Sequence, residues 1–244
     1  MSRKPPSILV VDDEPDICAN LRDILSEFGY QVDTARSVAS ALELVDRGSY
    51  DVALLDLKMP GMSGVELYKE IKRRSSETVA IIISAYASTF SANEALEAGA
   101  WRVLAKPVDI TQVMQCIDET MDQPIVMLVD DDEELCASLW DVLRSQGFRV
   151  KLAHNVADAS AALESQECQV AIVDLRLPGG DGLEICARVR EKNPRAKTIL
   201  ITGHRSELDQ RAGQFPAVDA TCYKPFDVGQ LLATMRRLME TRPK

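Results

Sequence analysis

Acidic, hydroxyl and amine side chains recur in this chain as two matched sets. In chain order the sets are Asp13, Asp56, Ser84 and Lys106, and then Asp131, Asp174, Thr202 and Lys224. Each member of the second set lies 118 positions after its counterpart in the first. A carboxylate can attack phosphorus as a nucleophile, an amine can offset the charge of a phosphoryl group, and a hydroxyl can donate a hydrogen bond to it. The ungapped repeat therefore indicates that a working unit for phosphate chemistry has been duplicated.

A second acid adjoins the first carboxylate of each set. Asp12 precedes Asp13, and Asp130 precedes Asp131. Three carboxylates that converge repel one another unless a hard cation neutralises them, and an oxygen-only ligand set of this kind suits Mg²⁺. We therefore expect one Mg²⁺ site in each copy, with the lysine and the hydroxyl placed opposite the carboxylates to contact a phosphoryl group.

The stretches between these residues alternate short β-branched runs with longer segments of helical period. In the first copy we expect strands near 7–11, 31–34, 52–55, 79–83 and 102–105. We expect helices near 15–28, 37–47, 64–72, 88–97 and 110–121, which gives a (βα)5 order in an α/β fold. The strand at 52–55 is apolar on both faces, as in a parallel sheet covered by helices on both sides. Because ligands bind beyond the carboxyl ends of such strands, the acids, the hydroxyl and the lysine should share one edge of the sheet.

The first helix of each copy has a predicted apolar stripe. In the first copy its members are Ile17, Leu21, Ile24, Leu25 and Phe28, and in the second copy they are Leu135, Leu139, Val142 and Leu143. Trp140 lies away from this stripe, at the repeat position of Arg22. We therefore expect its ring to face outward. We also expect it to contact a partner, the other domain or a second chain, since exposed indoles often anchor such contacts.

Several smaller features complete the expected architecture. Ser37 and Asn155 are expected to cap the second helix of their copies. In the second copy, the fourth helix near 205–212 is short and is followed closely by Gly213 and Pro216, so we expect it to be frayed. Six cysteines occur without any C-x-x-C spacing, which argues against a zinc site or a disulfide framework.

Length and charge limit the function classes that remain. The 244 residues accommodate two domains of about the usual size, which we place at 1–121 and 125–244 with a connector at 122–124. The net charge of −10 makes nucleic acid an unlikely direct partner. Neither a secretory signal nor an apolar run of about 20 residues is present, so we expect a cytoplasmic protein without membrane insertion.

With these residues in place, the chain resembles the response-regulator receiver family of two-component signalling. The strings that carry the resemblance are ILVVDDEPDI, LLDLKMPGMSG, IIISAYAS and LAKPVD in the first copy, and IVMLVDDDEEL, IVDLRLPGGDG, ILITGH and CYKPFD in the second. Four motifs in the same order and at equal spacing cover both copies nearly end to end. The resemblance implies a flavodoxin-like fold in each copy, with sheet order 2-1-3-4-5.

The resemblance also implies a role for each site residue. Asp56 and Asp174 would be the phosphorylated aspartates. Asp13 and Asp131 would bind Mg²⁺ directly, with Asp12 and Asp130 acting through water and the carbonyl oxygens of Lys58 and Arg176 completing the site. Lys106 and Lys224 would contact the phosphoryl group, each before a cis proline, and Ser84 and Thr202 would be the switch hydroxyls. The partner would be a histidine kinase or a histidine phosphotransfer protein, with a downstream protein or a homo-oligomer as further possibilities.

This sequence departs from the family at one position on the strand before the lysine. The aromatic residue that usually lies three positions before the lysine is replaced by Val103 and Thr221. We expect Tyr223 to have the wrong phase along its strand to substitute for it. Lys58 and Tyr86 occupy positions that flank the path of attacking water in the family, so we expect them to prolong the life of the Asp56 phosphate. Arg176 and His204 occupy those positions in the second copy, where we expect a different lifetime.

Other readings of the sequence stay open at this point. A metal-dependent phosphatase of the haloacid dehalogenase type also forms an aspartyl phosphate, but that family needs a second Asp where Lys58 and Arg176 stand here. The chain could instead be the regulatory front end of a longer histidine kinase or nucleotide cyclase. His154 and His204 could accept phosphate, although isolated surface histidines are the simpler interpretation. The glycines after Pro60 and Pro178 are expected to serve turns rather than to cradle phosphate. We favour an acceptor that is not a turnover enzyme.

Overall fold

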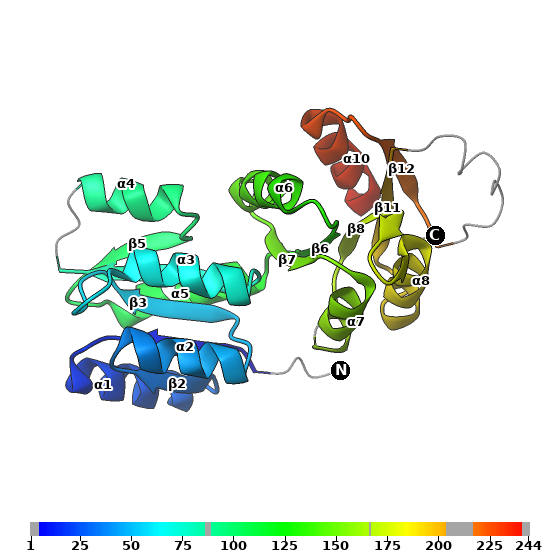
Figure 1. Cartoon of the computed structure of the whole chain (residues 1–244). Helices are drawn as coiled ribbons and strands as arrows, with labels where there is room; N and C mark the ends of the chain where they lie inside the picture. The colour runs from blue at the N-terminus through cyan, green and yellow to red at the C-terminus, as the bar shows by residue number, and fades with distance from the viewer. Residues whose placement is uncertain (1–4, 86–88, 166, 204–216, 241–244) are drawn as a thin grey trace. The chain divides into compact units, whose positions relative to one another are not determined.

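The structure is a computed structural model that describes residues 5–85, 89–165, 167–203 and 217–240. The chain divides into two compact units, Met1–Gln123 and Pro124–Lys244. In each unit the helices flank a central sheet, and the strands of that sheet all run in the same direction (Figure 1).

The first unit alternates strands and helices along the chain. In order, its elements are β1 Ser7–Val11, α1 Pro15–Glu27, β2 Gln31–Ala35, α2 Val38–Arg47, β3 Val52–Asp56, α3 Gly64–Arg74, β4 Val79–Ser84, α4 Thr89–Glu97, β5 Arg102–Ala105 and α5 Ile110–Met121. The strands form one sheet in the order β2-β1-β3-β4-β5. The predicted 2-1-3-4-5 order is confirmed, and the ends of the elements lie close to the expected ones.

The second unit repeats this plan. Its elements are β6 Ile125–Val129, α6 Glu133–Ser145, β7 Arg149–Ala153, α7 Val156–Ser165, β8 Val170–Asp174, β9 Arg176–Leu177, β10 Gly180–Asp181, α8 Gly182–Lys192, β11 Lys197–Thr202, β12 Ala220–Tyr223 and α10 Val228–Glu240. The main sheet has the order β12-β11-β8-β6-β7, which is the same arrangement read from the other edge. The short β9–β10 ribbon was not expected from the sequence, and the helix expected near 205–212 lies outside the described residues.

Burial on both faces explains why the central strands are continuously apolar. All five residues of β3 and all five of β8 are buried. In the first unit, one core cluster joins the strands to α1 and α5 through residues such as Leu25 and Ile117. In the second unit, a cluster on one face joins the strands to α7 and α8 through Ala159 and Ile185. Helices therefore cover the sheets, as the parallel arrangement requires.

Side chains at the helix ends satisfy free backbone groups. The Ser37 hydroxyl accepts the N–H of Ser40, and the Asn155 side-chain oxygen accepts the N–H of Asp158, so both predicted caps are confirmed. Gly29 follows α1 with φ +88°, a left-handed conformation that glycine adopts without strain.

The predicted stripes of α1 and α6 are confirmed in part: Leu21, Leu25, Leu139 and Leu143 are buried, but the buried face is displaced by part of a turn from the predicted one. Phe28 is 58% exposed and Ile24 is 37% exposed, whereas Cys18, Leu21 and Leu25 are buried. The buried positions therefore follow i, i+3 and i+7 from Cys18. This spacing keeps a narrow face of the helix against the sheet.

Trp140 belongs to the buried face of α6, which is displaced from the predicted stripe in the same way. It lies four residues after Cys136 and three before Leu143, and all three side chains are buried. The Arg144 guanidinium lies 5.4 Å from the centre of the indole ring, within the range of a cation–π interaction. The expectation of an outward-facing ring is thus wrong, because position 140 continues the buried face of α6 rather than leaving it.

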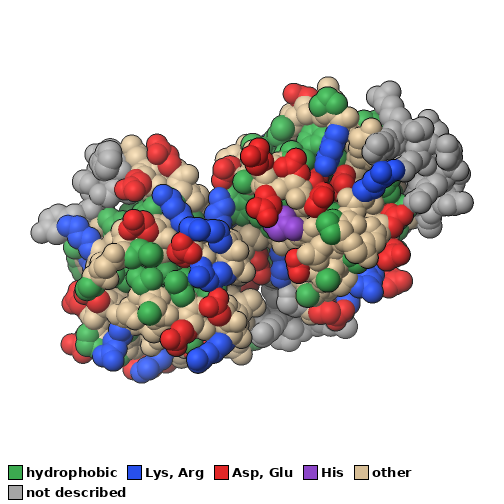
Figure 2. Space-filling view, viewed as in Figure 1, with side chains coloured by type: hydrophobic (Ala, Val, Ile, Leu, Met, Phe, Trp, Pro, Cys, Tyr) green, Lys and Arg blue, Asp and Glu red, His purple; other side chains and the backbone are tan. Residues whose placement is uncertain are grey.

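The remaining compositional expectations concern thiols and surface charge. All six cysteines are free, and five of them are buried. Within the described residues, no helix combines the length and the apolar character that crossing a bilayer requires. On the face shown in Figure 2, acidic and basic side chains are interspersed over both units.

Candidate functional site

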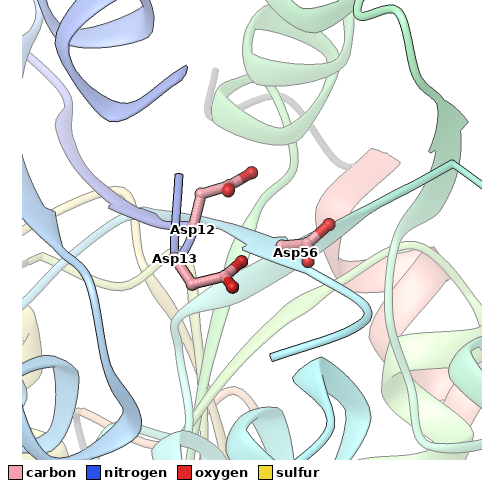
Figure 3. Close-up of side chains that lie close together, drawn as sticks. All are labelled: Asp12, Asp13 and Asp56. Carbon is pink, nitrogen blue, oxygen red and sulfur yellow. The ribbon is translucent and has the colours of Figure 1, made fainter. Parts of the chain in front are cut away.

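Three carboxylates of the first unit meet at the carboxyl edge of its sheet. Asp12 directly follows β1, Asp13 is next to it, and Asp56 is the last residue of β3. Each contributes a carboxylate oxygen to a set whose members all lie within 4.8 Å of one another (Figure 3). Asp12 and Asp56 are buried, whereas Asp13 is exposed. The group is therefore anchored on two sides and open on the third.

Lys106 holds two of these carboxylates together. Its Nζ lies 2.8 Å from Asp12 Oδ2 and 2.9 Å from Asp56 Oδ1. The other oxygen of Asp56 accepts the N–H of Lys58 at 3.1 Å. Asp12 also accepts the N–H of Glu14 at 2.9 Å through Oδ1. Both buried carboxylates are thus oriented by donors on each side.

Burial and ion pairing act against each other in this group. Desolvation raises the pKa of Asp56 above its ordinary value, and the hydrogen bond and charge of Lys106 only partly counter this effect. Burial by itself lowers the pKa of Lys106, but its hydrogen bonds and ion pairs with Asp12 and Asp56 outweigh burial, so the pKa is raised overall. The lysine stays charged, and the carboxylate of Asp56 is less stable than an exposed one.

Ser84 completes the first site from the next strand. It is the last residue of β4 and is 1% exposed. Its carbonyl oxygen accepts the N–H of Lys106 at 2.8 Å, which places the serine beside the start of the lysine side chain. The structure therefore brings the predicted acids, hydroxyl and lysine of the first copy to one edge of the sheet.

The second unit builds the same arrangement with small differences. Asp130, Asp131 and Asp174 form the matching acidic set, with Asp131 exposed. Lys224 Nζ lies 2.7 Å from Asp130 but 3.4 Å from Asp174, a looser contact than that of Lys106 with Asp56. Desolvation raises the pKa of Asp174, and the charge of Lys224 opposes the increase. Thr202, at the end of β11, is buried, and its carbonyl oxygen accepts the N–H of Lys224 at 2.8 Å.

The glycines beside Asp56 and Asp174 have a role that turn chemistry does not explain. A Cβ atom on Gly64 would overlap the carbonyl oxygen of Asp56, and one on Gly182 would overlap that of Asp174. Only glycine lets α3 and α8 begin this close to the strand ends. Gly61 and Gly179 fit the turn interpretation, since both have φ near +89° with open space around them.

Buried thiols also lie at both sites, and sequence patterns did not reveal them. Cys18 Sγ donates to the carbonyl oxygen of Asp12 at 3.3 Å, and Cys136 Sγ donates to that of Asp130 at 3.4 Å. Desolvation raises the pKa of Cys136 to about 12, so the thiol stays protonated and remains a donor. The only sequence signal was that these two cysteines are repeat equivalents.

His154 is not the isolated surface residue that we expected. Its side chain is half-buried, and Nδ1 lies 3.0 Å from the carbonyl oxygen of Asp130. Arg36, its repeat equivalent, is exposed. His204 and Tyr86 lie outside the described residues. The peptide bonds before Pro107 and Pro225 are cis, as the family resemblance implied.

The expected phase of Tyr223 is wrong. Side chains two residues apart on a strand point to the same face, so Tyr223 shares the face of Thr221. The two positions differ in burial: Tyr223 is half-buried and packs against the core cluster beneath α7 and α8, whereas Thr221 is exposed. At the matching positions of β5, Val103 is half-buried and Ala105 is exposed.

The chemistry of each site suits a hard cation and a phosphoryl group. The acidic side chains offer oxygen ligands only, and their exposed member leaves the group open to solvent. Asp56 and Asp174, held between a lysine and a backbone N–H, can act as nucleophiles toward phosphorus. The arrangement agrees with the sequence-based expectation of a carboxylate cluster for a cation beside a lysine and a hydroxyl.

Comparison with known proteins identifies the family. The response regulator receiver domain matches residues 8–118 and again residues 126–236. A response regulator receiver protein of Anaeromyxobacter sp. (strain Fw109-5) is 32% identical over 235 residues, which cover 96% of this chain and 95% of that protein. The transcriptional regulatory protein GlrR of Escherichia coli (strain K12) is 37% identical over 123 residues, which cover 50% of this chain but only 28% of GlrR.

A solved receiver-domain structure from Clostridium thermocellum is 32% identical and covers 48% of this chain and 94% of its own, with a TM-score of 0.46. The family assignment rests on the two receiver-domain matches, which together span most of the chain, and on the relative from Anaeromyxobacter, which aligns along almost its whole length. The chain therefore belongs to the response regulator receiver family and contains two receiver domains.

Proposed function

We propose that both receiver domains, at 1–121 and 125–244 with a connector at 122–124, accept phosphoryl groups on Asp56 and Asp174. The donor would be the phosphohistidine of a histidine kinase or a histidine phosphotransfer protein. One observation carries this proposal: each domain places a buried aspartate at a strand end, between a lysine ammonium and two further carboxylates.

The transfer would proceed by attack of the aspartate on phosphorus. A carboxylate oxygen of Asp56 forms a bond to phosphorus while the P–N bond to the donor imidazole breaks. The electron pair of that bond returns to the imidazole nitrogen, and the product is an acyl phosphate on Asp56. Lys106 is already within ion-pair distance of Asp56, so it can offset the charge of the phosphoryl group. The Ser84 hydroxyl would donate a hydrogen bond to a phosphoryl oxygen.

The acidic residues would hold Mg²⁺ for this reaction. In the first domain these are Asp12, Asp13 and Asp56 with the carbonyl oxygen of Lys58, and in the second they are Asp130, Asp131 and Asp174 with that of Arg176. When bound, Mg²⁺ supplies positive charge to the phosphoryl oxygens. Turnover as a phosphatase is disfavoured, because Lys58 and Arg176 stand where a second acidic residue would be needed.

The output would be transmitted by protein contacts in the cytoplasm, without direct binding to nucleic acid. A second candidate is a regulatory front end of a longer histidine kinase or cyclase. The observation behind it is only that some relatives are longer than the matched region, as in the transcriptional regulatory protein GlrR, where that region is 28% of the protein. The intact mass of the native protein separates these two candidates.

The direct test is phosphorylation by acetyl phosphate in the presence of Mg²⁺, followed by intact mass. We expect two phosphoryl groups on the wild type, one each on Asp56→Asn and Asp174→Asn, and none on the double variant or after chelation of Mg²⁺. A wild type that takes no phosphoryl group would refute the acceptor function. A wild type that never takes more than one would refute it for one domain, and the single variants would show which.

A further inference from the structure

The backbone carbonyl of Asp130 receives hydrogen bonds from two side chains. His154 Nδ1 lies 3.0 Å from its oxygen, and Cys136 Sγ lies 3.4 Å from it. A carbonyl oxygen has two lone pairs and can only accept, so Nδ1 carries a proton and the two donors together satisfy the oxygen. Cys136 belongs to α6, whereas His154 directly follows β7. The end of β6 is therefore tied to two neighbouring elements through one atom.

This carbonyl lies where the sheet no longer supplies a partner. The parallel pairing of β6 with β7 ends at Val129 and Ala153, one residue earlier. Asp130 is 0% exposed, and a buried carbonyl that loses its donors is destabilising. Side-chain donors therefore do at this position what backbone N–H groups do along the strand.

The same carbonyl sets the starting point of the exposed acid. The carbonyl of Asp130 and the N–H of Asp131 belong to one planar peptide unit, so donors that hold the carbonyl also hold the plane from which Asp131 begins. The carboxylate of Asp130 is fixed separately, by the N–H of Asp132 at 3.0 Å and by Lys224 at 2.7 Å. Among the described residues, the carboxylate of Asp131 has no hydrogen bond or ion pair of its own. Its position therefore depends on the backbone.

The first domain holds the matching peptide plane with fewer donors. Cys18 Sγ lies 3.3 Å from the carbonyl oxygen of Asp12, but the thiol is shared with the carbonyl oxygen of Ala35 at 3.6 Å. Arg36 stands at the repeat position of His154 and is exposed. In the parts of the two domains that the structure describes, only the second adds an imidazole to this carbonyl.

We propose that His154 and Cys136 are positioning residues for Mg²⁺ binding at the second site. They hold the Asp130–Asp131 peptide plane, so that the Asp131 carboxylate stays beside that of Asp174. The imidazole N–H is the stronger donor, and the thiol is a weak donor that supports it. Neither side chain would be a ligand of the ion. This inference rests on the proposed metal site of the second domain.

The test measures the dissociation constant of Mg²⁺ by calorimetry on the full chain with Asp13→Ala, which removes a ligand of the first site. We expect His154→Ala to raise the constant about fivefold, in keeping with the loss of one hydrogen bond. His154→Asn should stay near the parent value, because its amide nitrogen can take the place of Nδ1. His154→Gln should resemble His154→Ala, because its amide nitrogen lies where Nε2 does. The comparison of Asn with Gln holds even if His154→Ala folds poorly, since both keep a polar side chain.

Double variants test whether the two donors share one acceptor and act through Asp131. Cys136→Ala alone should raise the constant no more than about twofold, because the imidazole remains as a donor. In His154→Ala the same change should cost more, since the carbonyl then loses its last side-chain donor. In Asp131→Ala, His154→Ala should have little further effect, because the ligand that it positions is gone. Losses from Cys136→Ala and His154→Ala that simply add would contradict a shared acceptor.

The outcomes distinguish this inference from the proposed function. If the parent binds Mg²⁺ at the second site and His154→Ala binds it equally well, the imidazole does not position the site and the inference fails alone. Equal affinities of His154→Asn and His154→Gln would also overturn it, as would an undiminished effect of His154→Ala beside Asp131→Ala, because the side chain would then act through general packing. If the parent binds no Mg²⁺ at the second site, the proposed metal site fails first.

Discussion

Gly64 packs directly against the backbone of Asp56, so close that a Cβ atom at position 64 would overlap the Asp56 carbonyl oxygen. Gly182 has the same relationship to Asp174. The first turn of the helix and the end of the strand that carries the aspartate therefore form one junction in each domain. The position of Asp56 or Asp174 depends on a residue that carries no functional group.

Replacement of Gly64 by alanine should disturb this junction. We expect Gly64→Ala to lower the free energy of unfolding of the first domain by roughly 3 kcal/mol, because the obstructing atoms belong to the backbone and have little freedom to move aside. Urea unfolding would measure the loss. Gly48→Ala is the matched control. Position 48 has an extended φ of −156°, and a Cβ atom added there would lie 4.0 Å from its nearest neighbour, the carbonyl oxygen of Leu44. Equal stability of both variants would show that the junction can relax.

Neutralisation of Asp56 should stabilise the first domain when Mg²⁺ is chelated. Burial raises the folded-state pKa of Asp56 above its ordinary value of 3.8. The folded state then binds this proton more tightly than the unfolded state. This tighter proton binding contributes to the free energy of unfolding. The contribution is fully present below pH 3.8 and is lost as the pH rises through the folded-state pKa of Asp56.

At pH 7, the free energy of unfolding of Asp56→Asn should therefore exceed that of the wild type by roughly 1 kcal/mol. The urea transition should move to a higher concentration. The difference should disappear below about pH 4. Glu97→Gln, which removes an exposed carboxylate of α4, is the control for loss of one negative charge. An Asp56→Asn variant that is less stable than the wild type at pH 7 would mean that the Lys106 ion pair outweighs burial.

Lys106 should compete with Mg²⁺ for the carboxylates of the first site. Its ammonium lies within 2.9 Å of Asp12 and Asp56, both of which we expect to take part in metal binding. We expect Lys106→Met to bind Mg²⁺ on the order of tenfold more tightly, because a nearby positive charge has been removed, while phosphorylation of Asp56 slows. Calorimetry in Asp174→Asn measures the affinity, and the exposed Lys69 of α3 supplies the control variant Lys69→Met. Weaker binding would show that Lys106 mainly holds the carboxylates in place.

The phosphate on Asp56 should be long-lived. Lys58 is exposed beside the site, and Tyr86 follows Ser84 by two residues, where the family resemblance places it near attacking water. Each increase of about 1.4 kcal/mol in the hydrolysis barrier slows decay tenfold. We expect Lys58→Ala with Tyr86→Ala to shorten the lifetime measured in Asp174→Asn. An unchanged lifetime would remove the support for phosphate storage in this domain.

The equal spacing of the two sets made the sites predictable from the sequence. In a parallel sheet, the residues that follow the strands share one edge, so the position of each strand fixes the neighbours of its last residue. Asp56, Ser84 and Lys106 lie together for this reason. The same rule holds for the second copy.

Other features depended on three-dimensional packing. The apolar residues of α6 do not fix the centre of its buried face, and because adjacent helical positions differ by only about 100°, a small error in that centre places Trp140 outside instead of inside. Close approach at Gly64 depends on how tightly a helix meets a strand. The contact of His154 with Asp130 depends on the path of a loop. The approach at Gly64 and the contact of His154 leave no periodic signal in the sequence.

The buried thiols give this protein a built-in chemical probe of local opening. Cys18 and Cys116 lie in the first domain, and Cys136, Cys168 and Cys186 lie in the second, all shielded from solvent. A thiol reagent reacts with thiolate and needs access, so folded molecules should label slowly at these positions. Because Cys18 and Cys136 each donate to the backbone of an acidic residue, their labelling rates would report how often each acidic edge of the sheets unfolds. The opening rates of the two domains could then be compared within one sample of the protein.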